Sequence, residues 1–200
     1  MNLVVIAKEP LPGKAKTRLA AGVGVLAAAA LARAALADTF AVAGRVTGVR
    51  RVAAIDGDAG DWVPADWDRL AQCDGGLDQR LADVFQRLTG PSFLVGMDTP
   101  QLTVALLTAF DPRRYDAAIG PARDGGFWGI GFADGADGRL IRGVPMSTAH
   151  TFADQCRALR HLRLQILPEL DDVDTAADAD RVARAAPRSR FAQTYRNIAA

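Results

Sequence analysis

Short apolar runs alternate with helix-forming segments along most of the 200-residue chain. Runs rich in β-branched and aromatic residues predict strands at residues 2–7, 50–56, 92–97, 116–121, 126–132 and 162–168. Helical spacing and capping residues predict helices at residues 23–44, 77–88, 103–110, 147–160, 175–186 and 191–199. Such alternation predicts an α/β fold, a three-layer α/β/α sandwich around a mostly parallel mixed sheet. The length predicts one domain over residues 1–200.

The first predicted strand leads directly into a basic loop, AKEPLPGKAKTRLA, at residues 7–20. In parallel sheets, ligands bind beyond the carboxyl ends of the strands, and this loop follows such an end. A Pro-Gly turn exposes backbone N–H groups, and the cationic side chains are Lys8, Lys14, Lys16 and Arg18. With the positive end of the following helix, they predict a site for the phosphates of a nucleotide. A solvated loop whose lysines only aid solubility is the alternative.

Two familiar phosphate motifs do not fit this part of the chain. Gly13-Lys14 lacks the first glycine and the hydroxyl residue of a Walker A loop. The segment GVGVLA, at residues 22–27, imitates a dinucleotide fingerprint but does not directly follow a strand. Residues 39–55 also contain no acid to bind a ribose, so we discard the dinucleotide interpretation.

Aspartate dominates the acidic residues, with 21 Asp against only Glu9 and Glu169. Asp98 follows a predicted buried strand, where a carboxylate can hold a divalent cation together with substrate phosphates. Asp172 and Asp174 follow another strand, but Asp-x-Asp pairs recur at 56/58, 66/68, 172/174 and 178/180 and are weak evidence by themselves. Asp174 fits a metal ligand and the N-cap of the following helix equally well.

A glycine-rich segment, GPARDGGFWGIG at residues 120–131, joins two predicted strands. Asp124 fits the binding of an acceptor hydroxyl or a sugar, and Gly125 and Gly126 allow a ligand to approach the backbone closely. An Asp-Gly hairpin turn is the structural alternative. Ser147 or Thr148 is the predicted N-cap of the next helix, a position that suits a bound phosphate or no ligand.

Composition limits the partners of the chain. Its formal net charge is +1, so no global field attracts nucleic acid or an anionic membrane, and we expect neither as a partner. The alanine-rich segment 23–44 is long enough to span a membrane, but Arg33 and Asp38 interrupt it, which predicts a packed helix. Cys73 and Cys156 form no CxxC pattern; we expect buried thiols in a cytoplasmic protein.

Taken together, these segments resemble a known family, DUF2064. The segments that carry the resemblance, in the order seen in the family, are AKEPLPGKAKTRL, GMDTPQLT, GPARDGGFWGIG, PMSTAHT and LPELDDVDTAAD. The family is also known as rSAM/selenodomain-associated transferase 1, and the resemblance implies the GT-A fold of nucleotide-diphospho-sugar transferases. It is similar, more distantly, to 2-phospho-L-lactate guanylyltransferase and to molybdenum-cofactor nucleotidyltransferases.

The resemblance also implies roles for single residues. The phosphate loop of a nucleotide would contain Lys8, Gly13, Lys16 and Arg18, and further nucleotide contacts would come from Ala7, Pro12, Lys14 and Gly76. Asp98 would hold Mg²⁺ (or Mn²⁺), with Asp174 as the second ligand. The acceptor side would include Asp124, Gly125, Gly126, Ser147 and Thr148.

The sequence departs from the family pattern at three places. Asp98-Thr99-Pro100-Gln101 stands where the family usually reads Asp-Cys-Pro-Asp. Gly75-Gly76-Leu77-Asp78-Gln79-Arg80 replaces Gly-Asp-Leu-Gly-x-Arg, and Met146-Ser147-Thr148 replaces Trp-Ser-Thr. These changes bear on base or acceptor specificity and on the level of activity.

The expected reaction is metal-dependent nucleotidyl transfer from a nucleoside triphosphate to a phosphorylated or acidic small molecule. Lys8, Lys16 and Arg18 would stabilise charge on the leaving pyrophosphate, by positioning and electrostatics and without a protein nucleophile. A triphosphate is favoured because it needs more cation than a nucleotide sugar does. Glycosyl transfer from a nucleotide sugar and a nucleotide-binding module without turnover are the alternatives, and a homodimer stays open.

Overall fold

The computed structural model describes residues 1–199, and its strands form one seven-stranded sheet in the order β3-β2-β1-β4-β6-β5-β7. The strands are β1 (Asn2–Lys8), β2 (Arg50–Asp56), β3 (Asp68–Ala71), β4 (Ser92–Val95), β5 (Ala117–Pro121), β6 (Phe127–Phe132) and β7 (Leu164–Ile166). Strand β6 runs antiparallel to β4 and β5, whereas the other neighbouring strands are parallel. The predicted mostly parallel mixed sheet is therefore confirmed.

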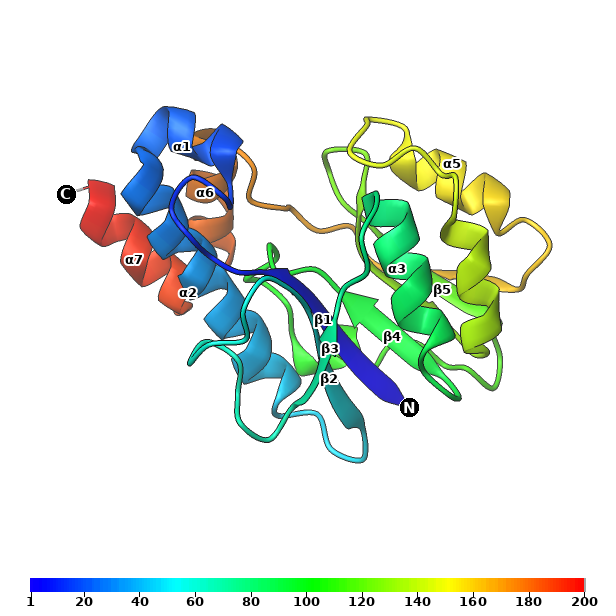
Figure 1. Ribbon diagram of the computed structural model, residues 1–200. Coiled ribbons are helices and arrows are strands. Elements are labelled where there is room, and N and C mark those ends of the chain that lie inside the picture. Colours follow the sequence, from blue (N-terminus) through cyan, green and yellow to red (C-terminus); the bar gives the residue numbers. More distant parts are fainter. Residues whose placement is uncertain (200) are drawn as a thin grey trace.

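Helices cover both faces of this sheet (Figure 1). They are α1 (Thr17–Val23), α2 (Val25–Ala43), α3 (Leu77–Gln86), α4 (Val104–Leu107), the 3₁₀ helix η1 (Gly135–Ile141), α5 (Thr151–Ala158), α6 (Ala176–Ala185) and α7 (Arg190–Ala199). Successive side chains of a strand point to opposite faces. Accordingly, Leu3 and Val5 of β1 pack in one core cluster with residues of α2, while Val4 packs in another with residues of α3. These two core clusters, one on each face of the sheet, give the predicted three layers, and a third cluster joins α1, α2, α6 and α7.

Helix α2 is long and apolar enough to cross a membrane by length and composition alone. Half of its most apolar window is nevertheless buried inside the fold, where Leu36 and Phe40 join the core and α7 packs alongside. Its Arg33 reaches the surface and pairs with Asp61 at 3.0 Å. The predicted packed helix is confirmed, and Gly24, at φ 86°, separates it from the short α1 that the sequence pattern did not predict.

Several predicted boundaries are wrong. Helix α5 begins at Thr151 with His150 as N-cap, so neither Ser147 nor Thr148 caps it. Instead, the Thr148 hydroxyl accepts a hydrogen bond from the N–H of His150, and the chain turns there with Ser147 at φ 60°. Strand β3 was missed because its residues are half-buried or exposed and carry no apolar run, so only its pairing with β2 defines it. The two cysteines are free thiols that are half-buried rather than buried.

Candidate active site

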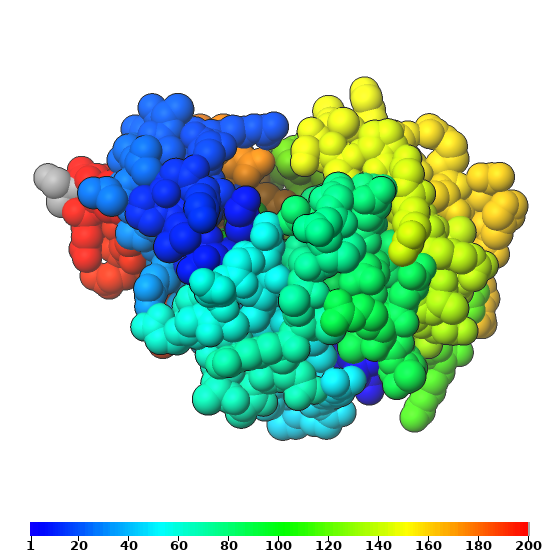
Figure 2. Space-filling model, in the orientation of Figure 1, coloured from blue at the N-terminus to red at the C-terminus, as the bar shows by residue number. Residues whose placement is uncertain are grey.

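Two adjoining cavities open at the carboxyl ends of β1 and β4, with volumes of about 390 and 310 Å³. Figure 2 shows the surface hollowed between the segment that holds α1 and the segment that holds α3 and α5. The residues that line both cavities are Lys8, Met97, Asp98, Asp124, Ser147 and Asp174. The parallel topology explains this meeting point, because loops that follow parallel strands gather at one edge of the sheet.

Lys16 lies between two carboxylates at this edge. Its Nζ is 2.8 Å from Asp98 Oδ2 and 3.0 Å from Asp174 Oδ1. Arg18 approaches the same group, with Nη1 3.6 Å from Asp174 Oδ2. The side chain of Lys16 is only 7% exposed, whereas that of Arg18 is 69% exposed. Of these two cations, Lys16 is therefore buried and Arg18 faces solvent. Arg18 and Asp98 therefore lie on the same side of the molecule.

The charge of Lys16 is stabilised by its carboxylate partners. Burial alone lowers the pKa of a lysine, but the charges and hydrogen bonds of Asp98 and Asp174 outweigh it, and the pKa of Lys16 lies above its usual value. Lys16 is thus an ammonium at neutral pH. Its backbone is left-handed, at φ 54° and ψ 47°, which costs a non-glycine residue roughly 1–2 kcal/mol. Tertiary contacts at the site, rather than local preference, hold this conformation.

Asp172 is a third carboxyl group beside this cluster. Thr99 is fully buried and donates a hydrogen bond to Asp172 Oδ1 at 2.8 Å. Burial raises the pKa of Asp172 to about 7, and the charge of Asp98 adds to that rise, against the opposing effects of Thr99 and Lys16. Oδ1 of Asp98 is buried without a hydrogen-bond partner among the described residues. The described residues therefore leave one oxygen of Asp98 without a partner.

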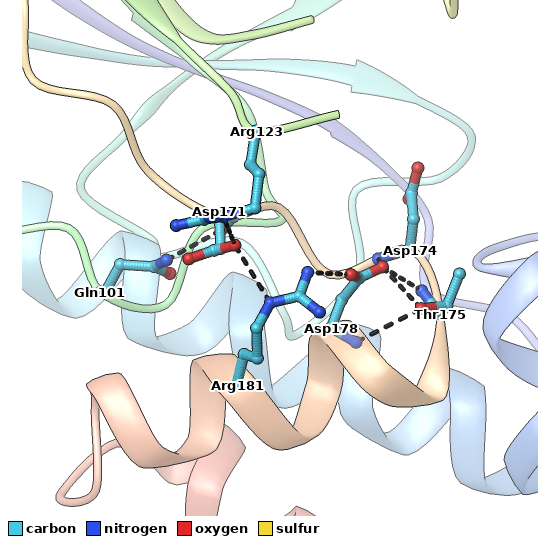
Figure 3. Close-up of polar contacts among 7 residues, drawn as sticks. All are labelled: Gln101, Arg123, Asp171, Asp174, Thr175, Asp178 and Arg181. Carbon is cyan, nitrogen blue, oxygen red and sulfur yellow. Dashed lines mark hydrogen bonds and ion pairs between the residues drawn. The ribbon is translucent and has the colours of Figure 1, made fainter. Parts of the chain in front are cut away.

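Asp174 is held by the start of α6. The N-cap of this helix is Thr175, whose hydroxyl accepts from Asp178 N–H, so the capping alternative for Asp174 is wrong. In return, Asp178 Oδ2 accepts hydrogen bonds from the backbone N–H groups of Thr175 at 2.7 Å and of Asp174 at 3.3 Å. Figure 3 shows the side chain of Asp174 pointing away from this capping box. The helix start fixes the backbone and leaves the carboxylate free for Lys16 and Arg18.

A polar network supports this segment from behind (Figure 3). Arg181 pairs with Asp178 and also reaches Asp171 Oδ1, at 3.3 Å, while Arg123 donates to the same Oδ1 at 2.7 Å. Gln101, one of the departures from the family pattern, donates from Nε2 to Asp171 O at 2.8 Å. Sequence reasoning missed the network because its partners come from four separate segments.

The predicted hairpin alternative at Asp124 is confirmed. The Asp124 carboxylate accepts from Gly126 N–H at 2.8 Å, and the turn joins antiparallel β5 and β6. At Gly125, with φ 90°, an added Cβ would lie 2.2 Å from Ala149 O, so the close approach there is made by the chain itself rather than by a ligand. Asp124 nevertheless lines both cavities, so its binding of the acceptor molecule stays a prediction.

The predicted site residues divide into four groups, according to which of the two cavities they line. Ala7 and Gly126 line the larger cavity, Lys14, Lys16 and Arg18 line the smaller one, and Lys8, Asp98, Asp124, Ser147 and Asp174 line both. Within the part of the chain that the structure describes, neither cavity is lined by Pro12, Gly13, Gly76, Gly125 or Thr148. The larger cavity is also lined by residues that sequence reasoning did not select, among them Asp56, Gln72, Leu77 and Arg80. Of these four residues, Asp56 could have been selected from its position, because it ends a predicted strand as Asp98 follows one.

Comparison with known proteins identifies the family of the chain. The family model described as "Uncharacterized protein conserved in bacteria (DUF2064)" matches residues 26–148, more than half of the 200 residues. The chain belongs to the DUF2064 family. In this DUF2064 protein the matched segment includes Asp98 and Asp124 but ends before Asp174 and begins after Lys16. None of the curated proteins compared with the chain matches it.

Solved structures share the fold. A protein from Desulfovibrio desulfuricans G20, described as a candidate nucleotide-diphospho-sugar transferase, is 28% identical, with 98% of this chain and 95% of that chain covered and a TM-score of 0.89. Rv0371C from Mycobacterium tuberculosis H37Rv, in complex with manganese, is 18% identical over 92% and 98% of the two chains, with a TM-score of 0.57. The inositol-1-phosphate CTP transferase from T. maritima is 12% identical over 94% and 95%, with a TM-score of 0.58. The predicted nucleotide-diphospho-sugar transferase fold is confirmed.

Proposed function

We propose that this DUF2064 protein is a nucleotide-using transferase that moves a nucleotidyl group from a nucleoside triphosphate to a phosphorylated or acidic small molecule. The observation that carries the proposal is the placement of Lys16 between Asp98 and Asp174, with Arg18 on Asp174. Cationic side chains from the first loop and carboxylates from two distant loops thus meet beside one cavity. A pyrophosphate group needs this combination of cations and metal-binding carboxylates.

The carboxylates fit a divalent cation. Asp98 and Asp174 already converge on one positive charge, the ammonium of Lys16, and Asp98 Oδ1 is buried without a partner among the described residues. Mg²⁺ is typically held by one or two carboxylates plus water and substrate phosphates. Residues 1–199 contain no cluster of three Asp, Glu, His or Cys that would enclose a metal by itself. This favours Mg²⁺ or Mn²⁺ that arrives with the nucleotide and is held by Asp98 and Asp174.

The proposed chemistry relies on positioning and charge. A bound metal ion would polarise the phosphates and neutralise part of their charge. Lys8, Lys14 and Arg18 line the cavity beside the carboxylates and would orient the triphosphate and stabilise the leaving pyrophosphate. Lys16 would exchange its carboxylate partners for phosphate oxygens when the nucleotide binds. No step requires a protein nucleophile.

Asp124 and Ser147 are proposed to bind the acceptor. Both residues line both cavities: Asp124 comes from the β5–β6 hairpin and Ser147 from the loop before α5. In the strand order, β5 and β6 lie in the half of the sheet away from β2 and β3. The inositol-1-phosphate CTP transferase, named for transfer to a phosphorylated acceptor, supports this class of reaction. Rv0371C in complex with manganese supports the metal.

Glycosyl transfer from a nucleotide sugar is the second candidate. It is favoured by the description of the Desulfovibrio protein as a candidate nucleotide-diphospho-sugar transferase. The two reactions release different products, since nucleotidyl transfer releases pyrophosphate and glycosyl transfer releases a nucleoside diphosphate.

The deciding experiment measures binding and product. The protein is titrated with each nucleoside triphosphate and with UDP- and GDP-sugars in the presence of Mg²⁺, and ligands that bind are incubated with pools of phosphorylated and acidic small molecules. We expect triphosphate binding and release of pyrophosphate. Binding of nucleotide sugars with release of a nucleoside diphosphate would support glycosyl transfer instead. Failure of every triphosphate to bind would overturn the proposal.

A further inference from the structure

Gln72 extends across the carboxyl ends of the neighbouring strands β1 and β2. It directly follows β3, and its backbone N–H donates to Ile55 O at 2.9 Å. Its side-chain Nε2 donates to Ala7 O of β1 and to Ala54 O of β2, both at 3.0 Å. The amide group is therefore tied to the ends of β1 and β2, and Gln72 lines the larger cavity together with Ala7 and Asp56.

These two hydrogen bonds determine which way the amide faces. Only the NH₂ end of a glutamine can donate, and both of its hydrogens are used by the two carbonyl groups. The reversed amide would place Oε1 against two carbonyl oxygens, which repel it. Oε1 has no partner among residues 1–199 and is not among their buried, unpartnered atoms. It is a hydrogen-bond acceptor of fixed direction that stays accessible.

The surroundings of Gln72 suit a nucleobase. Leu77, at the start of α3, is 44% exposed and lines the larger cavity together with Ile6, Ala7 and Leu81. Such an apolar wall suits the faces of a flat ring. Asp124 and Ser147, which come from other loops, also line this cavity and offer polar groups that suit an acceptor molecule. A nucleotide whose phosphates lie at Lys8 and Lys14 would therefore place its base toward Gln72.

A second acceptor lies on the same wall. Asp56, at the end of β2, lines the larger cavity and carries a carboxylate that Arg80 contacts at 2.7 Å and Lys8 at 3.9 Å. Both contacts are to Asp56 Oδ2, so among the described residues Asp56 Oδ1 and Gln72 Oε1 remain as the acceptors that these two side chains offer. An exocyclic amino group offers two N–H donors to such acceptors. Uracil offers only one N–H between two carbonyl groups, and the carbonyl oxygens are repelled by acceptor atoms of the protein.

We propose that Gln72 is a specificity-determining residue that reads the nucleobase and favours bases with an exocyclic amino group (cytosine, adenine or guanine) over uracil. The inference rests on the proposed function, because it assumes that a nucleotide occupies the larger cavity. A purely structural role, in which Gln72 only satisfies the carbonyl groups of Ala7 and Ala54, makes different predictions for two matched variants.

The two variants separate the donor from the acceptor. In Gln72→Lys, the ammonium can still donate to the carbonyl oxygens of Ala7 and Ala54 but accepts nothing. In Gln72→Glu, the carboxylate still accepts but no longer donates, so the two strand-end carbonyls lose their partner. A structural role predicts an intact Gln72→Lys protein with unchanged base preference and a damaged Gln72→Glu protein. A base-reading role predicts that Gln72→Lys keeps its melting temperature and loses its base preference.

The test is calorimetric titration of the full chain with Mg²⁺ and nucleotide pairs that differ in the amino group. The pairs are CTP with UTP, GTP with ITP, and ATP with purine riboside triphosphate. In the wild-type protein, we expect the amino-bearing member of the best-bound pair to bind about 10-fold more tightly. In Gln72→Lys, we expect the ratio within that pair to fall to about 2-fold or less. Gln72→Glu should melt at a lower temperature but still prefer the amino-bearing member.

Two results would overturn the inference while leaving the proposed function intact. One is equal binding of both members of every pair by the wild-type protein. The other is an unchanged ratio in a folded Gln72→Lys protein, which would show that Gln72 only joins the strand ends. If no triphosphate binds to the wild-type protein at all, the proposed function fails, and this inference fails with it.

Discussion

The ammonium nitrogen of Lys16 lies 2.8 Å from Oδ2 of Asp98, and the same nitrogen lies 3.0 Å from Asp174. The three residues come from the first loop, the loop after β4 and the loop before α6. A lysine thus occupies the place between two carboxylates that a divalent cation would take. Two positive charges cannot share that place, so Lys16 and a metal ion are expected to compete for it.

Lys16→Met should bind Mn²⁺ more tightly than the wild-type protein in the absence of nucleotide. Removal of the ammonium leaves Asp98 and Asp174 without their buried cation, and we expect a dissociation constant about 10-fold lower. Electron paramagnetic resonance of free Mn²⁺ measures it. Lys14→Met is the control, because Lys14 is exposed and lines the smaller cavity without an ion pair to either carboxylate among the described residues. Equal Mn²⁺ affinity in all three proteins would contradict the competition.

Asp98→Asn should destabilise the metal-free protein and abolish most of the proposed transferase activity. Lys16 would keep Asp174 but lose one charge partner, and we expect the free energy of unfolding to fall by about 1–2 kcal/mol, since Asp98 is partly exposed. Urea unfolding measures it. The double variant Lys16→Met, Asp98→Asn should lose less than the sum of the two single changes. Strict additivity would show that the contact contributes nothing to stability.

Asp178→Ala should loosen the start of α6. Asp178 accepts hydrogen bonds from the N–H groups of Asp174 and Thr175 and pairs with Arg181. Loss of this capping box is expected to cost about 1–2 kcal/mol and to lower turnover, because Asp174 loses its backbone anchor. Asp180→Ala is the matched control on the same helix, where the only ion pair among the described residues is with Arg184. Equal thermal unfolding of the two variants would argue against the anchoring role.

Gly125→Ala should be far more damaging than Gly126→Ala. At Gly125 the backbone has φ 90° and an added Cβ would lie 2.2 Å from Ala149 O, whereas at Gly126 the nearest atom is the flexible Asp124 Oδ1, at 3.1 Å. We expect a loss of about 2 kcal/mol or more for the first and well under 1 kcal/mol for the second. Differential scanning calorimetry measures both. Similar melting temperatures would mean that the hairpin and the loop at Ala149 can move apart without cost.

Asp116→Asn should lower stability near neutral pH but not at strongly acidic pH. Hydrogen bonds from the side chain and the backbone N–H of Arg163 lower the pKa of Asp116 to about 2. Because the folded-state pKa lies below the usual value of 3.8, the stabilisation is present above about pH 4 and is lost as the pH falls through 2. Unfolding of both proteins between pH 7 and pH 2 measures the difference. A gap that stays constant down to pH 2 would exclude this ion pair as its cause.

The sequence predicted the layers and the positions of several site residues from local signals. Strand β4 is buried throughout, and β1 and β2 each contain a continuous buried stretch of four residues, so apolar runs marked all three directly. The charge of the basic loop and the place of Asp98 behind a strand are also local properties. By contrast, β3 has no apolar face, and α5 begins after a turn that Thr148 and His150 make with each other. These two elements depend on contacts rather than on composition.

The amino-acid sequence by itself determined the alternation of strands and helices and supplied cations and aspartates at strand ends. Only the tertiary structure decided which of these groups meet. It brings Asp174, rather than the Asp56 and Asp58 pair, to Lys16, makes Thr175 the helix cap, and places Gln72 across the ends of β1 and β2. The physical reason is that periodicity reports which side of an element is buried, whereas charge pairing depends on distances between segments far apart in the chain.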